Sequence, residues 1–235
     1  MESQTLRSLG FLSLDQGFPS GVISPTTEPG CFLNPASYDF PFIIETVEGA
    51  CADIVIRGDP ALEPACIAAA KRLVERGAVV ISADCGFYIR HQAAVAAAMN
   101  VPVALSSLLL VPTLLRQLPS AAKLAVVTAD STNCSEDLLG IDDPNNRARV
   151  VIGGVEGGQM LRDCLMRPPF PTDIADIEKE VGECITRLRA VNPEIAAILF
   201  ECTAFPVVTS RIRRSTGLPA YDITDLCRLT FASVS

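Results

Sequence analysis

The chain has 235 residues, of which 49% are hydrophobic, and it carries a formal net charge of -8 at pH 7. An acidic surface repels phosphate backbones and anionic lipid headgroups, which argues against nucleic acid or a membrane as the partner. The nine cysteines are odd in number and form no CxxC pair, which argues against a disulfide framework and a metal site. We therefore expect a cytoplasmic protein with reduced thiols and no bound metal.

Short apolar runs alternate with segments of helical length along the whole chain. In the first half, we predict strands at 9–14, 52–57 and 101–105, a strand ending at Cys85, and helices at 61–76, 88–99 and 108–118. In the second half, we predict strands at 123–128, 149–152, 196–200 and 218–223, with helices at 173–191, from Pro206 onward and at the C-terminus. This alternation indicates parallel sheets with right-handed crossovers.

One pattern occurs twice. The segment Val79–Phe87 is an apolar run that leads into Asp84-Cys85, and Ala196–Ala204 is a second such run that leads into Glu201-Cys202. The two cysteines are 117 residues apart, and a proline follows each of them after the same interval of seventeen residues. We therefore predict a first α/β lobe at 1–116, which carries Cys85, and a second at 117–235, which carries Cys202. The C-terminal helix can pack back on the first lobe.

The predicted architecture is two pseudo-symmetric, flavodoxin-like lobes with parallel sheets and an active site in the cleft between them. In such sheets, ligands bind beyond the carboxyl ends of the strands, and both cysteines lie at such ends. The segment 16–39 is rich in Gly, Pro, Ser and Thr and is long for a loop without secondary structure, so we expect it to be functional or to form a lid.

Two thiols on opposite sides of one cleft can invert a carbon acid. A thiol at a strand-to-helix junction lies in the positive electrostatic potential of the helix N-terminus, which can lower the pKa of the thiol toward neutrality. One thiolate would then remove a proton, and the opposite thiol would return one to the other face. Gly86 lets the backbone approach a substrate closely, and Thr203 adds a hydroxyl. This chemistry needs no cofactor.

The acidic neighbours Asp84 and Glu201 complicate this assignment, because a nearby carboxylate raises the pKa of a thiol. Strand alternation places them on the other side of the sheet from the sulfurs, and we predict a structural role for them, in capping or ion pairing. The alternative for Cys85 and Cys202 is plain packing, since free cysteine is often buried.

The residues resemble the aspartate/glutamate racemase superfamily nearly from end to end. The resemblance rests on the strand leading to Asp15, the Asp84-Cys85-Gly86-Phe87 turn, the 127–130 segment, Glu201-Cys202-Thr203 and the 216–219 segment. It implies a cofactor-independent mechanism with Cys85 and Cys202 as the acid/base pair. The substrate contacts that it implies are Asp15, Gln16, Gly86, Phe87, Thr128, Asp130, Ser131 and Thr203.

This chain departs from the amino-acid racemases of the superfamily beside both thiols. Gly86-Phe87 and Thr203-Ala204 stand where those enzymes tend to carry polar residues, and Phe87 favours a less polar ligand. We predict a pyridoxal-independent isomerase, a racemase or epimerase of a small carboxylate carbon acid such as an amino acid derivative. The alternatives are a decarboxylase or cis-trans isomerase of the same superfamily that uses one cysteine, or a non-catalytic small-molecule binding protein. The sequence leaves open whether the chain forms homo-oligomers.

Overall fold

The computed structural model describes residues 7–18 and 28–234, and its contacts divide the chain into two compact units. Unit 1 comprises Met1–Ser106 and Thr224–Ser235, and unit 2 comprises Ser107–Ile223. The central strand in each unit pairs in parallel with two neighbours, as the alternation of strands and helices predicts. Part of the segment proposed as a lid, residues 19–27, lies outside the described residues.

Unit 1 contains a sheet in the order β2-β1-β3, with every pair parallel. Its strands are β1 (Ser8–Ser13), β2 (Phe42–Thr46) and β3 (Ala78–Ala83). Its helices are η1 (Pro35–Ser37), α1 (Ala52–Arg57), η2 (Pro60–Leu62), α2 (Glu63–Glu75), η3 (Gly86–His91), α3 (Gln92–Ala98) and α9 (Ile223–Ala232). Helix α2 packs against all three strands, and the six residues of β1 are all buried.

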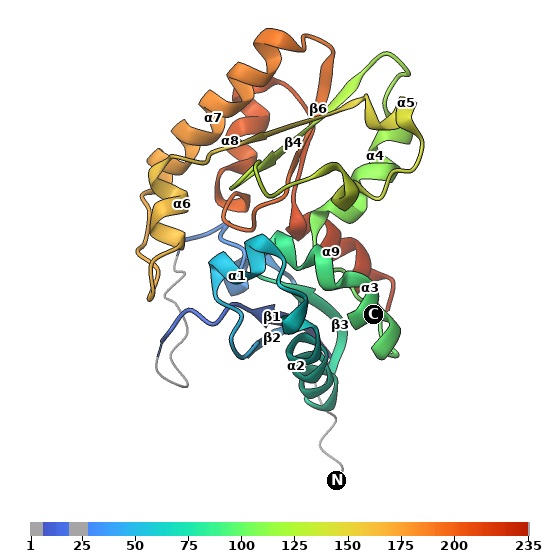
Figure 1. Cartoon of the computed structure of the whole chain (residues 1–235), viewed down its shortest axis with the longest axis vertical. Helices are drawn as coiled ribbons and strands as arrows, with labels where there is room; N and C mark the ends of the chain where they lie inside the picture. Colours follow the sequence, from blue (N-terminus) through green and yellow to red (C-terminus); the bar gives the residue numbers. More distant parts are fainter. Residues whose placement is uncertain (1–6, 19–27, 235) are drawn as a thin grey trace. The chain divides into compact units, whose positions relative to one another are not determined.

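Unit 2 repeats this topology with one strand more, in the order β5-β4-β6-β7. Its strands are β4 (Lys123–Thr128), β5 (Val150–Gly154), β6 (Ile195–Phe200) and β7 (Ala220–Tyr221). Its helices are η4 (Ser107–Leu110), α4 (Val111–Gln117), η5 (Glu136–Leu139), α5 (Pro144–Arg147), α6 (Gln159–Cys164), α7 (Ile174–Val191) and α8 (Pro206–Thr216). Figure 1 shows α7 and α8 on one face of this sheet and α4 on the other.

The strand predicted at 52–57 is wrong, because this segment forms helix α1. Its β-branched residues favour a strand, but local signals favour the helix. Asp53 lies in the first turn and forms an ion pair with Arg57 one turn later, and Gly58 ends the helix in the left-handed conformation at φ 75°. The second strand of the sheet is instead β2, within a segment for which the sequence analysis predicted no element.

The strand predicted at 101–105 is reduced to a single parallel bridge between Ile81 and Val103. The backbone of Ile81 hydrogen bonds to Pro102 and Ala104 on either side of this bridge. Proline has no N–H to donate to a ladder, which limits how far the pairing can extend. The segment nevertheless lies beside β3, where a fourth strand would lie.

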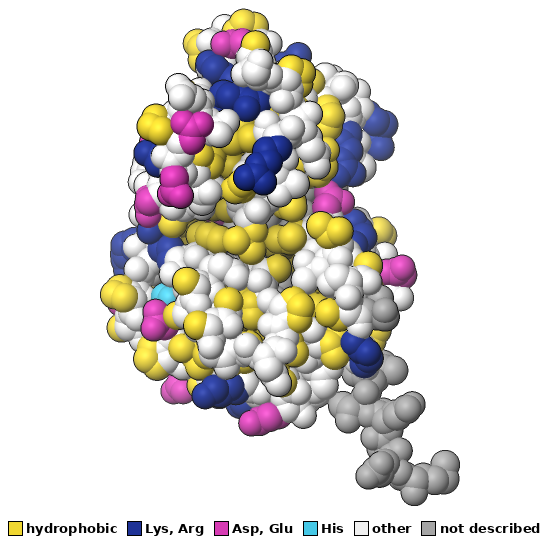
Figure 2. All heavy atoms as spheres, turned by 90° about the vertical axis from the view of Figure 1, so that its right-hand side faces the viewer, with side chains coloured by type: hydrophobic (Ala, Val, Ile, Leu, Met, Phe, Trp, Pro, Cys, Tyr) yellow, Lys and Arg dark blue, Asp and Glu magenta, His cyan; other side chains and the backbone are white. Residues whose placement is uncertain are grey.

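No helix in the described part of the chain is long and apolar enough to cross a membrane. Acidic and basic side chains intermingle on the face of the molecule that Figure 2 shows. The exposed large hydrophobic side chains include Leu165, Met166 and Phe170, which lie between α6 and α7.

The packing of α2 on β1 yields a prediction for Gly10. A Cβ atom at this position would lie 2.9 Å from Ala78 Cβ and 3.1 Å from Leu73 Cβ. We expect Gly10→Ala to lower the free energy of unfolding by about 1–3 kcal/mol, because neither neighbour can move freely. The control is Gly182→Ala within α7, where a Cβ meets nothing within 4 Å and should raise the stability by about 0.5–1 kcal/mol. Urea denaturation measures both, and equal effects would contradict this account of the packing.

Candidate active site

Cys85 lies directly beyond the carboxyl end of β3, where the chain turns into η3. Its backbone is extended, with φ -142° and ψ 127°, and its carbonyl accepts a hydrogen bond from the amide of Tyr88 at 3.1 Å. Cys85 is partly exposed, whereas Gly86 and Phe87 are buried. The ring of Phe87, at 2% exposure, therefore belongs to the core of unit 1.

Asp84 fixes this turn to the central strand. Its carboxylate accepts hydrogen bonds from the hydroxyl of Ser13 at 2.6 Å and from the amide of Leu14 at 2.9 Å. Burial raises the pKa of Asp84 to about 6, although both hydrogen bonds act in the opposite direction. The structural role predicted for Asp84 takes this form, and its partner Ser13 was not among the predicted site residues.

Asp15 and Gln16 follow the central strand β1 of the same sheet. The side chain of Asp15 accepts a hydrogen bond from the amide of Gly17 at 3.2 Å, and its own amide donates to Ala50 at 2.9 Å. Because β1 and β3 are parallel neighbours, their carboxyl ends lie at one edge of the sheet. Unit 1 thus brings both residues to the edge that carries Cys85.

Cys202 occupies the equivalent place in unit 2, beyond β6. The expectation that a helix terminus lowers its pKa is wrong. Burial of the thiol, the negative charge of Glu201 and the neighbouring Cys164 together raise the pKa of Cys202 well above its ordinary value. Helix α8 begins only at Pro206, so several residues separate the sulfur from the helix end. The predicted apposition of the two sulfurs concerns two units and stays a prediction.

Thr128 ends the central strand of unit 2, and its hydroxyl has an internal partner. It donates to a carboxylate oxygen of Glu201 at 2.8 Å, and both side chains are buried. The hydroxyl oxygen also accepts from the amide of Asp130 at 3.3 Å. Thr203 follows Cys202 directly and is partly exposed. Thr128 therefore orients the carboxylate of Glu201, the residue that precedes Cys202.

Asp130 and Ser131 follow β4, and their polar groups also have internal partners. The two oxygens of Asp130 accept from the amide and hydroxyl of Thr132 and from Asn133, and these bonds lower the pKa of Asp130. The amide and hydroxyl of Ser131 both donate to Glu156, at 3.0 and 2.6 Å.

Glu156 was not predicted at this edge from the sequence. The glycine at position 154 indicates this contact, because a Cβ atom there would lie 1.8 Å from the Glu156 carboxylate and 2.7 Å from the Ser131 amide. The glycine is therefore needed for the carboxylate to reach that amide. The absence of a side chain at Gly154, the last residue of β5, thus accommodates an internal carboxylate.

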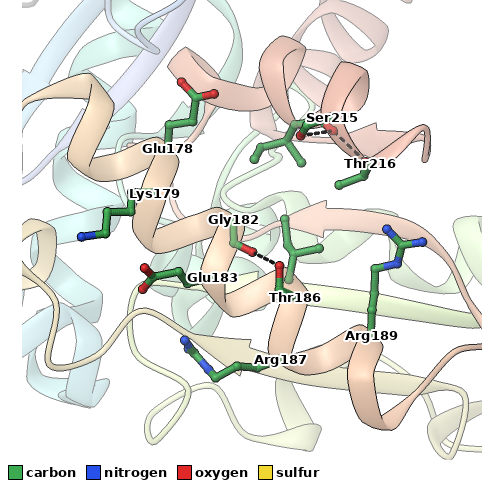
Figure 3. Close-up of a pocket in the computed structure, with 11 residues that line it drawn as sticks. Glu178, Lys179, Gly182, Glu183, Thr186, Arg187, Arg189, Ser215 and Thr216 are labelled. Carbon is green, nitrogen blue, oxygen red and sulfur yellow. Dashed lines mark hydrogen bonds between the residues drawn. The ribbon is translucent and has the colours of Figure 1, made fainter.

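Other candidate sites in the described residues carry no comparable chemistry. The described residues contain no cluster of three or more His, Cys, Asp or Glu side chains that could hold a metal ion. A groove of about 740 Å³ lies between α7 and α8 and is shown in Figure 3. None of the predicted site residues lines this groove.

The fold has known counterparts among solved structures. A glutamate racemase isoform from Bacillus anthracis superposes with a TM-score of 0.59 at 13% identity, covering 98% of this chain and 82% of that one. A mutant of arylmalonate decarboxylase in a sulfate-associated form gives 0.58 at 19% identity, covering 95% and 93%. The chain therefore shares the fold of these two enzymes. This confirms the resemblance and the two-lobed α/β fold, while likeness at such low identity shows the fold alone.

The similar sequences carry a different name. A dimethylsulfoniopropionate lyase from Durusdinium sp. clade D is 30% identical over 204 residues, which covers 83% of this chain and 66% of that protein. Dimethylsulfoniopropionate lyase 3 from Emiliania huxleyi is 25% identical over 236 residues, which covers 97% and 60%. The chain thus spans less than two thirds of the length of these relatives. No protein-family model matches the chain.

These relatives overturn the predicted activity. A racemase or epimerase is an isomerase, whereas the sequence relatives are named lyases. The isomerase prediction and the racemase function are therefore wrong on this comparison. The lyase names fit the one-cysteine alternative better than two-base inversion, because an elimination needs a base on one face only.

The raised pKa of Asp84 predicts the pH dependence of stability. Because the folded state holds this proton up to about pH 6 and the unfolded chain releases it near 3.8, wild type should lose stability relative to Asp84→Asn as the pH rises from about 4 to 7. The expected change is on the order of 1–3 kcal/mol in the free energy of unfolding, measured with urea.

Asp130→Asn is the control of opposite sign. The pKa of Asp130 is lowered by its hydrogen bonds, so its contribution is present at neutral pH and is lost as the pH falls below about 4. The account of Asp84 fails if the stability difference between wild type and Asp84→Asn stays constant from pH 4 to 7.

Proposed function

We propose that the chain is a lyase that cleaves the carbon–sulfur bond of dimethylsulfoniopropionate or a closely similar sulfonium carboxylate. The observation that carries the proposal is the sequence likeness to proteins named dimethylsulfoniopropionate lyase, which extends over 97% of the chain in one comparison. A span of that length includes the segments around both Cys85 and Cys202.

The reaction is a β-elimination. A base removes a proton from the carbon next to the carboxylate, and the electron pair of that C–H bond forms a carbon–carbon double bond. The bond between the next carbon and the sulfonium sulfur breaks, and its electron pair leaves with neutral dimethyl sulfide. The remaining product is acrylate, and the proton passes from the base to solvent. The reaction needs neither an oxidant nor a second base.

A cysteine thiolate supplies the base in this proposal, and Cys85 is the better candidate of the two. Both cysteines are partly exposed residues, but desolvation of the sulfur and the charge of Glu201 raise the pKa of Cys202, which disfavours the thiolate that a base requires. Cys85 is partly exposed and follows β3, whose parallel neighbour β1 leads to Asp15 and Gln16 at the same edge of the sheet. The amides of the turn that begins at Gly86 are the candidate donors to the substrate carboxylate, whose negative charge grows as the proton leaves.

The cysteines also support the cytoplasmic location proposed from the sequence. All nine lie within the described residues and none forms a disulfide there, and several are buried, including Cys66 and Cys184. Burial raises the pKa of these two thiols to about 12 and about 11, which keeps them inert. A chain with nine reduced thiols suits a reducing compartment.

The test is release of dimethyl sulfide from dimethylsulfoniopropionate, followed by headspace gas chromatography at pH 7.5. We expect wild type to release it and Cys85→Ser to lose a factor of about 10² to 10⁴ in kcat, because a serine hydroxyl is a poor base. Cys202→Ser should retain a substantial part of the activity, since its thiol is not the base.

Two outcomes separate the parts of this proposal. Loss of activity in Cys202→Ser with retention in Cys85→Ser would move the base to unit 2 and leave the lyase function intact. If wild type releases no dimethyl sulfide but is stabilised against heat by the same compound, the chain binds the sulfonium carboxylate without turning it over, and the lyase function is overturned.

A further inference from the structure

Each unit contains a buried hydrogen-bonded pair, in which a hydroxyl residue contacts the acidic residue that precedes the cysteine. In unit 1, the hydroxyl of Ser13 donates to Asp84 at 2.6 Å, and in unit 2, the hydroxyl of Thr128 donates to Glu201 at 2.8 Å. We call each pair a clasp. All four side chains are at most 8% exposed.

The backbone repeats the same arrangement. The amide of Asp84 donates to the carbonyl of Leu12 at 2.9 Å, and the amide of Glu201 donates to the carbonyl of Val127 at 2.9 Å. In both units the carbonyl belongs to the residue just before the hydroxyl residue. The acidic residue is therefore attached to the end of the central strand by its main chain and its side chain at once.

The cysteine follows the clasped acid directly in each unit. A hydrogen bond of this kind restricts the conformations of the acidic residue. Through one peptide unit it also restricts the backbone of the turn that carries the cysteine. In unit 2 the clasp also holds a carboxylate near the thiol, since Glu201 is the second largest cause, after burial, of the raised pKa of Cys202. A buried charge is expensive to place without hydrogen bonds, so each hydroxyl stabilises the carboxylate in that position.

We propose that Asp84 and Glu201 are positioning residues, each held by the hydroxyl at the end of its central strand so that it fixes the adjacent cysteine turn and places a carboxylate beside the thiol. A catalytic role for either cysteine rests on the proposed function. The placement of the carboxylates does not, and it can be tested without a substrate.

Unit 2 contains a matched control for the clasp. The hydroxyl of Thr209 donates to Asp222 at 2.7 Å, and both side chains are buried. This pair has the same chemistry and a similar length, but neither member is adjacent in sequence to a cysteine. Asp222→Asn therefore measures what loss of a buried carboxylate does to unit 2 in general.

The test is the rate at which iodoacetamide alkylates Cys202 in the folded full-length chain at pH 8, resolved by mass spectrometry of the peptide. In Glu201→Gln, the side chain keeps its shape and an oxygen that accepts from Thr128 but loses its charge. We expect the rate to rise about threefold for each unit by which the thiol pKa falls, since the thiolate fraction grows tenfold while its nucleophilicity decreases. Asp222→Asn and Asp84→Asn should leave the rate at Cys202 unchanged.

A second variant tests the hydroxyl of the clasp in unit 1. Ser13→Ala should lower kcat for dimethyl sulfide release about tenfold with little change in KM, because the base is misplaced while binding persists. Ser13→Thr, which restores a hydroxyl, should recover most of kcat. If Ser13 has only a structural role, Ser13→Ala lowers stability but does not lower kcat selectively, and Ser13→Thr does not restore kcat.

The proposal is overturned if Glu201→Gln leaves the alkylation of Cys202 unchanged, or if Asp222→Asn accelerates it as much. If wild type shows no lyase activity but Glu201→Gln still accelerates alkylation selectively, the clasp stands and the proposed function fails. Circular dichroism of each variant checks that the chain is folded, so a rise in alkylation that comes from unfolding is recognised by parallel changes at the buried Cys184.

Discussion

The structure depends on the register between the central strand of each unit and the strand that carries its cysteine. In unit 1, β1 and β3 are parallel neighbours, and in unit 2 the same holds for β4 and β6. This register brings a hydroxyl at the end of one strand to an acidic side chain at the end of the other. The cysteine, the buried carboxylate before it and the turn that follows are all placed by this one constraint.

The sequence was sufficient to predict that Cys85 and Cys202 follow the carboxyl ends of two strands, because an apolar run that ends in an acidic residue and a cysteine occurs twice. It did not predict β2, because the β-branched residues of Ala52–Arg57 favour a strand there, although an i,i+4 ion pair and the left-handed Gly58 stabilise a helix in that segment. It also missed Ser13 and Glu156. Their partners are 71 and 25 residues away in the chain, and local pattern carries no information about such contacts.

The erroneous assignment of an isomerase has a chemical reason. Racemisation and β-elimination both begin with removal of a proton from the carbon beside a carboxylate, and they differ only in what happens to the electron pair that is left. A thiol at a strand end identifies the first step and says nothing about the second. Structural neighbours at 13–19% identity share this ambiguity, since they include a racemase and a decarboxylase. The named sequence relatives separate the two outcomes.

The most direct test of this account follows the fate of the substrate carbon by proton NMR in deuterium oxide. Wild type incubated with dimethylsulfoniopropionate should produce dimethyl sulfide and acrylate in equal amounts, and aspartate or glutamate should keep their α-protons. The account is contradicted if the sulfonium compound stays intact while the α-proton of an amino acid exchanges with solvent.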